Sequence, residues 1–211
     1  DLQEPLRKIR AFGNRLYSGY KDVMDERGQD FLARMLNAAE RMSMLISDLL
    51  SFSRVSTRGK DFEQVNVGDV IDGVLGDLEI AIEEKGANVI VQDIPTIRAD
   101  KSQIDQLFLN LLSNALKFQT ADKAPLIEIT ATPPSEADMK DILLADEYDW
   151  IKIQISDNGI GFEQSFAEKI FAPFQRLHGR SEYKGTGIGL AVCRRIVERH
   201  NGQISAKSSP G

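Results

Sequence analysis

Two glycine-rich segments carry the residue types in this chain that are best suited to bind a nucleotide. The segment Gly185-Thr186-Gly187-Ile188-Gly189-Leu190 opens a predicted helix, and the backbone amides at a helix start favour phosphate. The segment Asp157-Asn158-Gly159-Ile160-Gly161 follows a predicted strand. There Asp157 can accept a hydrogen bond from an exocyclic amine, while glycine lets the backbone approach a flat base.

A pair of asparagines upstream of both segments could serve the same ligand. Asn110 and Asn114 lie one helical turn apart, so their side chains can face one metal–phosphate cluster. Mg²⁺ prefers oxygen ligands, which asparagine amides and phosphates provide. In this order, the three motifs predict a site for ATP and Mg²⁺.

Each motif has a plainer interpretation when taken alone. Asp-x-Gly-x-Gly is often a simple turn, and an asparagine pair on a helix usually faces solvent. The spacing of Gly185, Gly187 and Gly189 is superficially that of a dinucleotide fingerprint, but residues 181–184 do not form a strand pattern before it. A Rossmann fold is therefore not expected.

The first third of the chain has a different pattern from the part that carries these motifs, and it is predicted to be a helical hairpin. Its apolar residues follow heptad spacing, with a turn expected at residues 18–25 and a linker at 53–60. The apolar stripe covers two adjoining faces and favours a four-helix bundle, with a second copy of the chain as partner. Packing of the hairpin on the rest of the same chain is the alternative. The heptad positions are Leu32, Met35, Ala39, Met42, Ile46 and Leu49, and the matching positions of the first helix are Leu2, Leu6, Ile9, Phe12 and Leu16.

The remainder alternates between strand and helix patterns, which indicates an α/β sandwich with one helical layer on a mixed sheet. Strands are expected at 65–67, 88–93, 126–132, 150–156 and 203–206. Helices are expected at 70–84, 101–118, with Asp100 as N-cap, and 187–200. Residues 133–149 are predicted to be an excursion between two hairpin strands. The overall fold class is therefore α plus α/β, with domains at 1–56 and 57–211.

Composition limits the classes of function. The net charge of −6 argues against non-specific binding of nucleic acid. The single cysteine, Cys193, excludes an internal disulfide and fits a reducing compartment. No apolar run is long enough to cross a bilayer, so we expect a cytoplasmic chain and leave membrane anchoring of a longer parent protein open.

The motifs together resemble the sensor histidine kinases of two-component systems, most closely the phytochrome-type and PAS-linked class. Residues 110–118 are similar to the N box of that family, 157–161 to the G1 box, 171–174 (Phe-Ala-Pro-Phe) to the F box and 185–189 to the G2 box. The hairpin resembles the dimerisation and phosphotransfer domain. The resemblance implies a GHKL-type ATP-binding domain, a homodimer formed through residues 1–56, an upstream sensor domain and a response-regulator receiver domain as partner.

The resemblance also implies roles for individual residues. Asn114 would bind Mg²⁺, Asn110 would position metal and phosphates, and Asp157 would recognise adenine. Lys117 and Arg176 would offset phosphate charge while a lid from Phe171 to Lys184 closes. The implied nucleotide-binding residues are Asn110, Asn114, Lys117, Asp157, Gly159, Gly161, Phe171, Phe174, Arg176, Lys184, Gly185, Thr186, Gly187, Ile188, Gly189 and Leu190.

The roles of four residues in the predicted lid stay open. Phe171 and Phe174 could be hydrophobic anchors or gates. Arg180 and Lys184 could contact the nucleotide or be lid charges only.

Related ATPases of the gyrase, Hsp90 and MutL type place a glutamate where Asn110 stands. Asparagine cannot take a proton from water at neutral pH, so the site favours phosphoryl transfer, with hydrolysis as the alternative. A second alternative is a nucleotide-gated dimer scaffold without catalysis.

In the resembled family, the phosphoaccepting histidine directly precedes an acid, which would be Asp1, and Pro5 stands where the family has its proline. We therefore expect the acceptor histidine immediately before Asp1, with Asp1 orienting the imidazole and Pro5 loosening the helix beside it. The catalytic residues would be Asp1, Asn110, Lys117 and Arg176. The chain itself would bind ATP without phosphorylating itself, because His178 and His200 are better explained by structural or capping roles.

Two further expectations concern the ends of the chain. Glu4 occupies the place where many relatives carry threonine or asparagine, so phosphatase activity towards the regulator is doubtful. At the other end, the turn-like residues 208–211 suggest that a further strand is missing.

Overall fold

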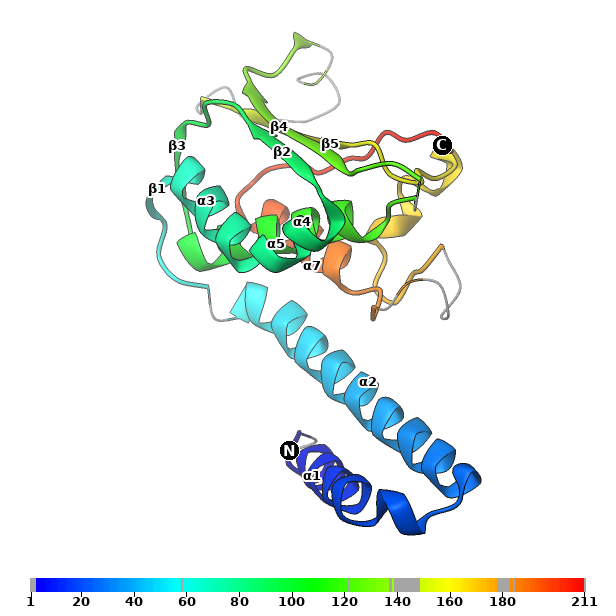
Figure 1. Ribbon diagram of the computed structural model, residues 1–211. Helices are drawn as coiled ribbons and strands as arrows, with labels where there is room; N and C mark the ends of the chain where they lie inside the picture. The colour runs from blue at the N-terminus through cyan, green and yellow to red at the C-terminus, as the bar shows by residue number, and fades with distance from the viewer. Residues whose placement is uncertain are drawn as a thin grey trace. The chain divides into compact units, whose positions relative to one another are not determined.

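The computed structural model divides the chain into two compact units, the hairpin (residues 1–54) and the C-terminal unit (residues 55–211). It describes residues 3–57, 59–120, 122–136, 138, 149–177, 183 and 185–210. Figure 1 shows the helical hairpin and the α/β architecture of the C-terminal unit. The division falls close to the domain boundary predicted after residue 56.

The hairpin consists of α1 (Gln3–Tyr20), a short 3₁₀ helix η1 (Lys21–Val23) and α2 (Glu26–Thr57). The two helices approach closely at Gly13, where an added methyl group would press on Leu36. The linker predicted from Ser53 onward is wrong in its first part, because α2 continues to Thr57. The helix can continue through this segment because residues 53–58 contain neither proline nor glycine.

Few apolar side chains of the hairpin are buried: they are Leu6, Leu32 and Ala39. A long row of large apolar side chains on both helices remains exposed instead. It comprises Ile9, Phe12, Leu16, Tyr17, Tyr20, Phe31, Met35, Met42, Met44, Leu49 and Leu50. The expected two-faced apolar stripe is therefore present, and the described part of the chain covers only one side of it.

The C-terminal unit contains two small sheets. β2 (Asn88–Val91) pairs in parallel with β4 (Leu126–Thr132), and β4 pairs antiparallel with β5 (Lys152–Asp157). β1 (Glu63–Asn66) and β3 (Thr96–Ala99) form a separate antiparallel pair. The mixed sheet is thus confirmed.

Helices α3 (Val67–Asp77), α4 (Glu79–Lys85), α5 (Lys101–Lys117) and α7 (Gly189–Arg199) form one layer against the three-stranded sheet (Figure 1). Between them lies a continuous core, which includes Val67, Ile71, Phe108, Leu112, Ile127 and Ile129. The predicted sandwich with one helical layer is therefore correct.

Several predicted elements differ from the structure. The single helix expected at 70–84 is two helices that meet at Leu78, whose amide bonds back to the last turn of α3. The strand expected at 203–206 is absent. That segment is held by the side chain of Gln164, which bonds Ala206 O and Ser208 N, so its backbone joins no ladder. The predictions also missed β3, a four-residue strand that begins directly after Pro95.

Two 3₁₀ helices, η2 (Gln164–Phe166) and η3 (Lys169–Phe171), connect β5 to the region before α7. The excursion expected at 133–149 lies largely outside the described residues, and its role stays open. Among the described residues, the model contains no helix both long and apolar enough to cross a membrane.

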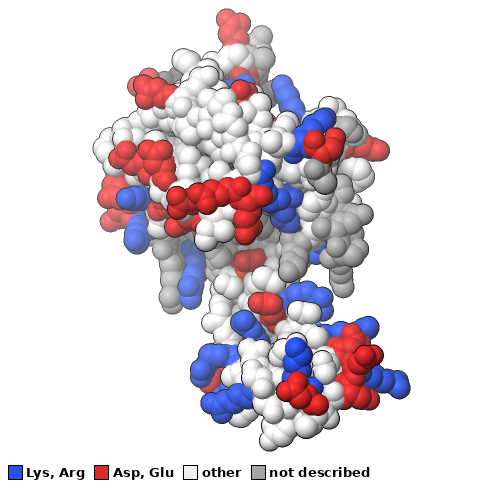
Figure 2. Space-filling view, in the orientation of Figure 1, with Lys and Arg blue, Asp and Glu red and all other residues white. Residues whose placement is uncertain are grey.

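The charged side chains are unevenly distributed over the C-terminal unit. Figure 2 shows acidic side chains gathered over α3 and α4, where Asp69, Asp72, Asp77, Glu79, Glu83 and Glu84 are exposed. This face repels polyanions such as nucleic acid.

Candidate nucleotide site

Helix α5 is the element that brings the predicted motifs together. It begins at the buried Asp100, whose carboxylate accepts from the amides of Ser102 and Gln103 and so caps the helix, as predicted. Its apolar face contributes Phe108 and Leu112 to the core, which leaves the last two turns to face the glycine segments.

Asn110 meets the start of α7. Its amide nitrogen lies 3.4 Å from the carbonyl oxygen of Gly189, and its side chain also contacts the buried thiol of Cys193. Burial raises the pKa of that thiol to about 12, so the cysteine stays protonated and inert. Asn114 lies one turn farther along α5, half-buried, and has no side-chain partner among the described residues.

Lys117, at the end of α5, meets the glycine segment before α7. Its ammonium lies 2.8 Å from the point where a side chain on Gly185 would begin, and 4.4 Å from the centre of the Phe118 ring. Burial lowers the pKa of Lys117, and the positive charge of Arg176 lowers it further. Two cations held together at a partly buried position fit an anionic ligand.

The segment after β5 packs on the residue that follows α5. The amide of Ile160 donates to Phe118 O at 3.0 Å. Asn158 bridges to the start of β4 by bonding Leu126 N at 2.8 Å and Ala124 O at 3.0 Å. Asn158 therefore has a structural role that the sequence analysis missed.

Asp157 is oriented by its own loop, because one carboxylate oxygen accepts from Gly159 N at 2.9 Å. The two glycines are needed for a reason other than the predicted one. A methyl group at Gly159 would overlap Phe118 O, and one at Gly161, which has φ of 59°, would overlap Ser209 O. Both positions are thus restricted by packing of the chain on itself, and base contact at these glycines stays a prediction.

Tyr183 also contributes to this region, although no sequence motif points to it. Its ring lies 5.0 Å from that of Phe118, and its hydroxyl donates to Gln119 O at 3.3 Å. Arg176 bonds Tyr183 O at 2.6 Å and Gly185 O at 2.7 Å. The guanidinium predicted to offset phosphate charge therefore also ties together the backbone on both sides of residue 184.

The two phenylalanines of the predicted F box have different environments. Phe171 is 4% exposed and lies under the guanidinium of Arg194 at 4.6 Å, which supports the anchor alternative. Phe174 is 58% exposed and has a φ of 64°. Its backbone lies against Gly187, whose φ is 78° and where a methyl group would come within 2.8 Å of Gln175 O. Only glycine accommodates both constraints at position 187.

The remaining predicted site residues fall into two groups. Thr186 accepts from the amide of Ile188 at 3.4 Å, and Ile188 is buried immediately before α7, which Gly189 and Leu190 open. Asp1, Lys184, His178 and Arg180 lie outside the described residues. His200 ends α7, as expected from the sequence, and its ring stacks on that of Phe62.

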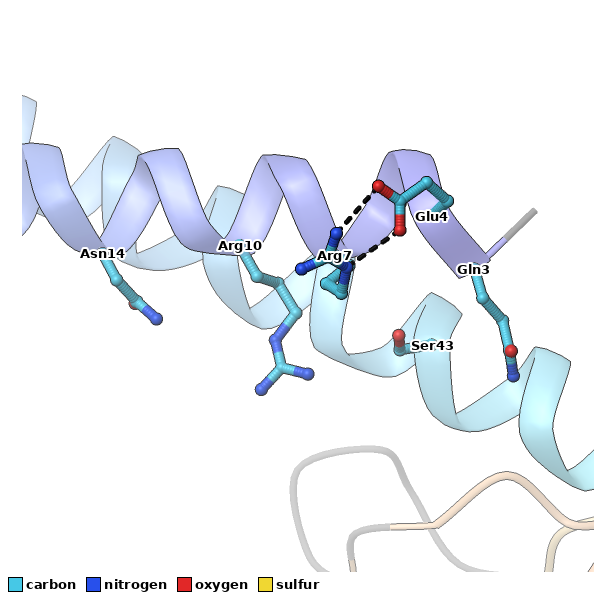
Figure 3. Close-up of a pocket in the computed structure, with 6 residues that line it drawn as sticks. All are labelled: Gln3, Glu4, Arg7, Arg10, Asn14 and Ser43. Atoms are coloured by element: carbon cyan, nitrogen blue, oxygen red, sulfur yellow. Dashed lines mark hydrogen bonds and ion pairs between the residues drawn. The ribbon is translucent and has the colours of Figure 1, made fainter. Parts of the chain in front are cut away.

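The N-terminal end of the hairpin carries a polar hollow of about 430 Å³ (Figure 3). Gln3, Glu4, Arg7, Arg10 and Asn14 line it from α1, and Ser43 from α2. Arg7 holds Glu4 with two hydrogen bonds of 2.8 and 2.9 Å, and these bonds lower the pKa of the Glu4 carboxyl. Glu4 therefore presents a negative charge rather than a neutral hydrogen-bonding group.

The residues around α5 fit a nucleotide with its metal. Among the described residues no cluster of histidine, cysteine or carboxylate side chains could hold a metal ion by itself. Asn110 and Asn114 nevertheless offer amide oxygens, and Mg²⁺ normally completes its shell with phosphates and water. Lys117 and Arg176 supply positive charge at the same end of α5.

Comparison with known proteins agrees with this geometry. Residues 99–211 match the family described as histidine kinase-, DNA gyrase B- and HSP90-like ATPase. Over its whole length, the chain is 39% identical to the phytochrome-like protein Cph1 of Synechocystis sp., and the aligned region is 26% of that protein. It thus spans about a quarter of that relative's length.

Solved structures share the fold. Full-length ShkA in complex with AMPPNP matches all of this chain and 41% of its own length, with a TM-score of 0.69 at 20% identity. The histidine kinase ThkA in complex with the response regulator protein TrrA matches 99% of this chain and 56% of its own length, with a TM-score of 0.61 at 20% identity.

The family match covers more than half of the chain, and it includes the asparagine pair and both glycine segments. The chain therefore belongs to the histidine kinase-, DNA gyrase B- and HSP90-like ATPase family.

Proposed function

We propose that this chain is the kinase core of a two-component sensor, which transfers the γ-phosphoryl group of ATP to a histidine and from there to an aspartate of a response regulator. In the first transfer, the bond from the γ-phosphorus to the bridging oxygen breaks and a phosphorus–nitrogen bond to the imidazole forms. ADP leaves with the bridging oxygen.

The observation that carries the proposal is the convergence of three motifs on α5. Asn110 contacts Gly189, Lys117 lies beside Gly185, and Phe118 packs on the Asp157 segment. Along this row, the helix-start amides near Gly189 and the cations near Gly185 are available to phosphates, and the oriented carboxylate of Asp157 is available to adenine.

The choice of a kinase over a hydrolase rests on Asn110. Its amide is turned towards Gly189 and cannot act as a general base, whereas the hydrolytic alternative needs a group that activates water. Asn114 is free among the described residues to bind Mg²⁺, and Asn110 positions the metal and phosphates beside it.

The acceptor would be a histidine directly before Asp1, because His178 and His200 are the only histidines in the sequence. His200 is engaged by Asp100 N and Ile196 O, which leaves neither ring nitrogen available as a nucleophile. Asp1 would orient the acceptor imidazole.

We also propose that the hairpin forms a homodimer. Within residues 3–54, the buried hydrophobic side chains are Leu6, Leu32 and Ala39, while a row of exposed apolar side chains includes Phe12 and Met35. A second copy would cover this row and complete a four-helix bundle. We further propose that this core acts in the cytoplasm, where ATP is available, and that it is connected to a sensor domain of a longer protein.

Two measurements on purified protein test the proposal. The 211-residue chain should bind ATP in a Mg²⁺-dependent way and should not label itself from γ-labelled ATP. A separate hairpin that carries the histidine before Asp1 should acquire an acid-labile, alkali-stable label when this chain is added.

The alternatives give different results in the same experiment. Steady release of inorganic phosphate without hairpin labelling would favour a hydrolytic ATPase. ATP binding with neither reaction would favour the non-catalytic scaffold. Label on His178 or His200 would contradict the assignment of the acceptor.

A further inference from the structure

A buried polar cluster lies far along α5 from the proposed nucleotide site, at the helix start. The Asp100 carboxylate, in a residue 1% exposed, accepts from Ser102 Oγ at 2.6 Å, Lys60 N at 2.7 Å and Arg199 Nη1 at 3.1 Å. Burial by itself would raise the pKa of Asp100, but these hydrogen bonds and the charge of Arg199 outweigh it and lower the pKa. The carboxylate is therefore ionised and fully engaged.

Arg199, at the end of α7, extends the cluster to the segment that follows α2. Its guanidinium donates to Gln103 Oε1 at 2.7 Å and to Lys60 O at 2.8 Å, and lies 5.0 Å from the centre of the Phe62 ring. Gln103 in turn donates to Val55 O at 3.1 Å. The last turn of α2 and the segment that follows it are thus bonded to α5 and α7.

His200 closes the cluster from the other side. Its ring stacks on Phe62 with the centres 4.5 Å apart and the planes 7° from parallel. Nδ1 lies 2.7 Å from Ile196 O, and Nε2 lies 3.1 Å from the amide nitrogen of Asp100. Because the Asp100 amide can only donate, Nε2 must accept, and the ring is neutral with its proton on Nδ1.

Gly59 makes room for this arrangement. A methyl group at position 59 would overlap the Arg199 guanidinium, which could not then reach Lys60 O. The need for glycine is purely steric, since the backbone of Gly59 is not in the left-handed region.

The bonded segment, which we call the connector (residues 55–57 and 59–62), is where the C-terminal unit begins after the hairpin. We propose that Asp100, Gln103, Arg199 and His200 form a clamp that fixes the connector to the C-terminal unit and thereby maintains the supply of phosphoryl groups to the linked hairpin. This rests on the proposed kinase function. A fixed connector shortens the flexible path between the two units and so raises the effective concentration of bound ATP at the hairpin.

The clamp should affect phosphorylation only of a hairpin that is covalently linked to the C-terminal unit. Releasing it should slow phosphorylation of a hairpin in the same chain, while ATP affinity and phosphorylation of a separate hairpin stay the same. A cluster that only stabilises the fold would change both reactions equally or neither.

The sharpest variant is Gly59→Ala, because it displaces the flexible end of Arg199 without removing any polar group. Gly73→Ala is the matched control, since nothing lies within 4 Å of an added methyl group at that position in α3. Arg199→Met serves as a second clamp variant.

Amide hydrogen exchange on the 211-residue chain tests the clamp itself. Exchange at Lys60 N, which donates to Asp100, should rise about tenfold or more in Gly59→Ala and remain unchanged in Gly73→Ala. Equal exchange in the two variants would overturn the clamp.

Labelling experiments then test its function, using the chain extended at its N-terminus to include the acceptor histidine. Gly59→Ala and Arg199→Met should label their own hairpin about threefold more slowly or less, with unchanged labelling of an added separate hairpin. Faster exchange with unchanged linked labelling would overturn the coupling role. Absence of labelling in every protein, wild type included, would instead refute the kinase proposal and leave the exchange result to decide the clamp.

Discussion

The hairpin and the C-terminal unit differ in how far their apolar side chains are buried. The C-terminal unit encloses Ile71, Phe108, Ile127 and others in one core of strands and helices. The hairpin leaves Phe12 and Met35 each 61% exposed. One unit encloses a core of its own, whereas the other exposes apolar side chains that we propose are covered by the hairpin of a second copy of the chain.

The difference separates two tasks. The C-terminal unit can hold nucleotide without a partner, because all its proposed ligand-binding residues come from its own α5, α7 and connecting segments. In the proposed dimer, the contacts between the two copies come from the hairpins. Changes in one unit should therefore leave the task of the other intact.

The largest expected effect is on transfer. Asn114→Ala should reduce ATP-dependent labelling of a histidine-bearing hairpin by about 100-fold or more, because the metal loses a proposed ligand. Ser113→Ala, its exposed neighbour on α5, is the control. Radiolabel incorporation measures transfer, and sedimentation should show the same dimer in all three proteins. A shift in dimerisation would break the proposed separation of tasks.

A matched pair of truncations compares the two units directly. Phe108→Ala, at a position 2% exposed, should lower the free energy of unfolding of the C-terminal unit by about 3–5 kcal/mol. Phe12→Ala should leave that unfolding transition unchanged and weaken the dimer, because its ring is exposed in the single chain. Denaturant titration and sedimentation equilibrium distinguish the two. An unchanged dimer affinity in Phe12→Ala would contradict the four-helix bundle.

A smaller effect is expected at Tyr183. Its ring covers part of Phe118, beside the segment proposed to recognise adenine. Tyr183→Ala should therefore bind ATP several-fold more tightly, measured by calorimetry. Tyr183→Phe keeps the ring and should bind like the wild type. Weaker binding by Tyr183→Ala would mean that this ring contacts the nucleotide instead of competing with it.

The smallest effect is a pH dependence confined to the C-terminal unit. Burial lowers the pKa of His200, with the Ile196 carbonyl and Asp100 opposing and Arg199 adding to the shift. The unfolded chain therefore binds a proton at higher pH than the folded one. Stability should fall as pH decreases below the ordinary histidine pKa of 6.5 and level off below the folded pKa.

Thermal unfolding between pH 7.5 and 5.5 measures this dependence, and His200→Gln should weaken it. The sequence of the hairpin contains no histidine, so its dimerisation should be constant over the same range. A pH-dependent dimer would place the titrating group elsewhere.

The fold could be predicted largely from sequence because periodicity records burial. The apolar faces of α5 and β4 contribute to the core of the C-terminal unit, and β4 was predicted at its exact bounds. The strand prediction fails at residues 203–206, where the Gln164 side chain bonds the backbone instead of a neighbouring strand. The prediction also missed β3, which is too short to show a periodic pattern.

The site was partly predictable for a related reason. Asn110, Lys117 and the glycine segments have fixed spacing in sequence, and α5 brings them together. Tyr183 contacts Phe118 across 65 positions of the sequence, and Arg199 contacts Lys60 of the connector across 139 positions. Neither contact follows a local sequence pattern. Only the folded chain makes them visible.

Helix α5 also sets a length. From Asn110 to Phe118 the chain rises about 12 Å, at roughly 1.5 Å per residue, and this rigid interval separates the residue beside α7 from the residue beside the Asp157 segment. In the proposed site, the helix therefore sets the distance between the start of α7 and the Asp157 segment. Inserting a single residue between Asn110 and Phe118 would turn one of these contacts by about 100° around the helix axis, so we expect this helix to accept substitutions more readily than any change in its length.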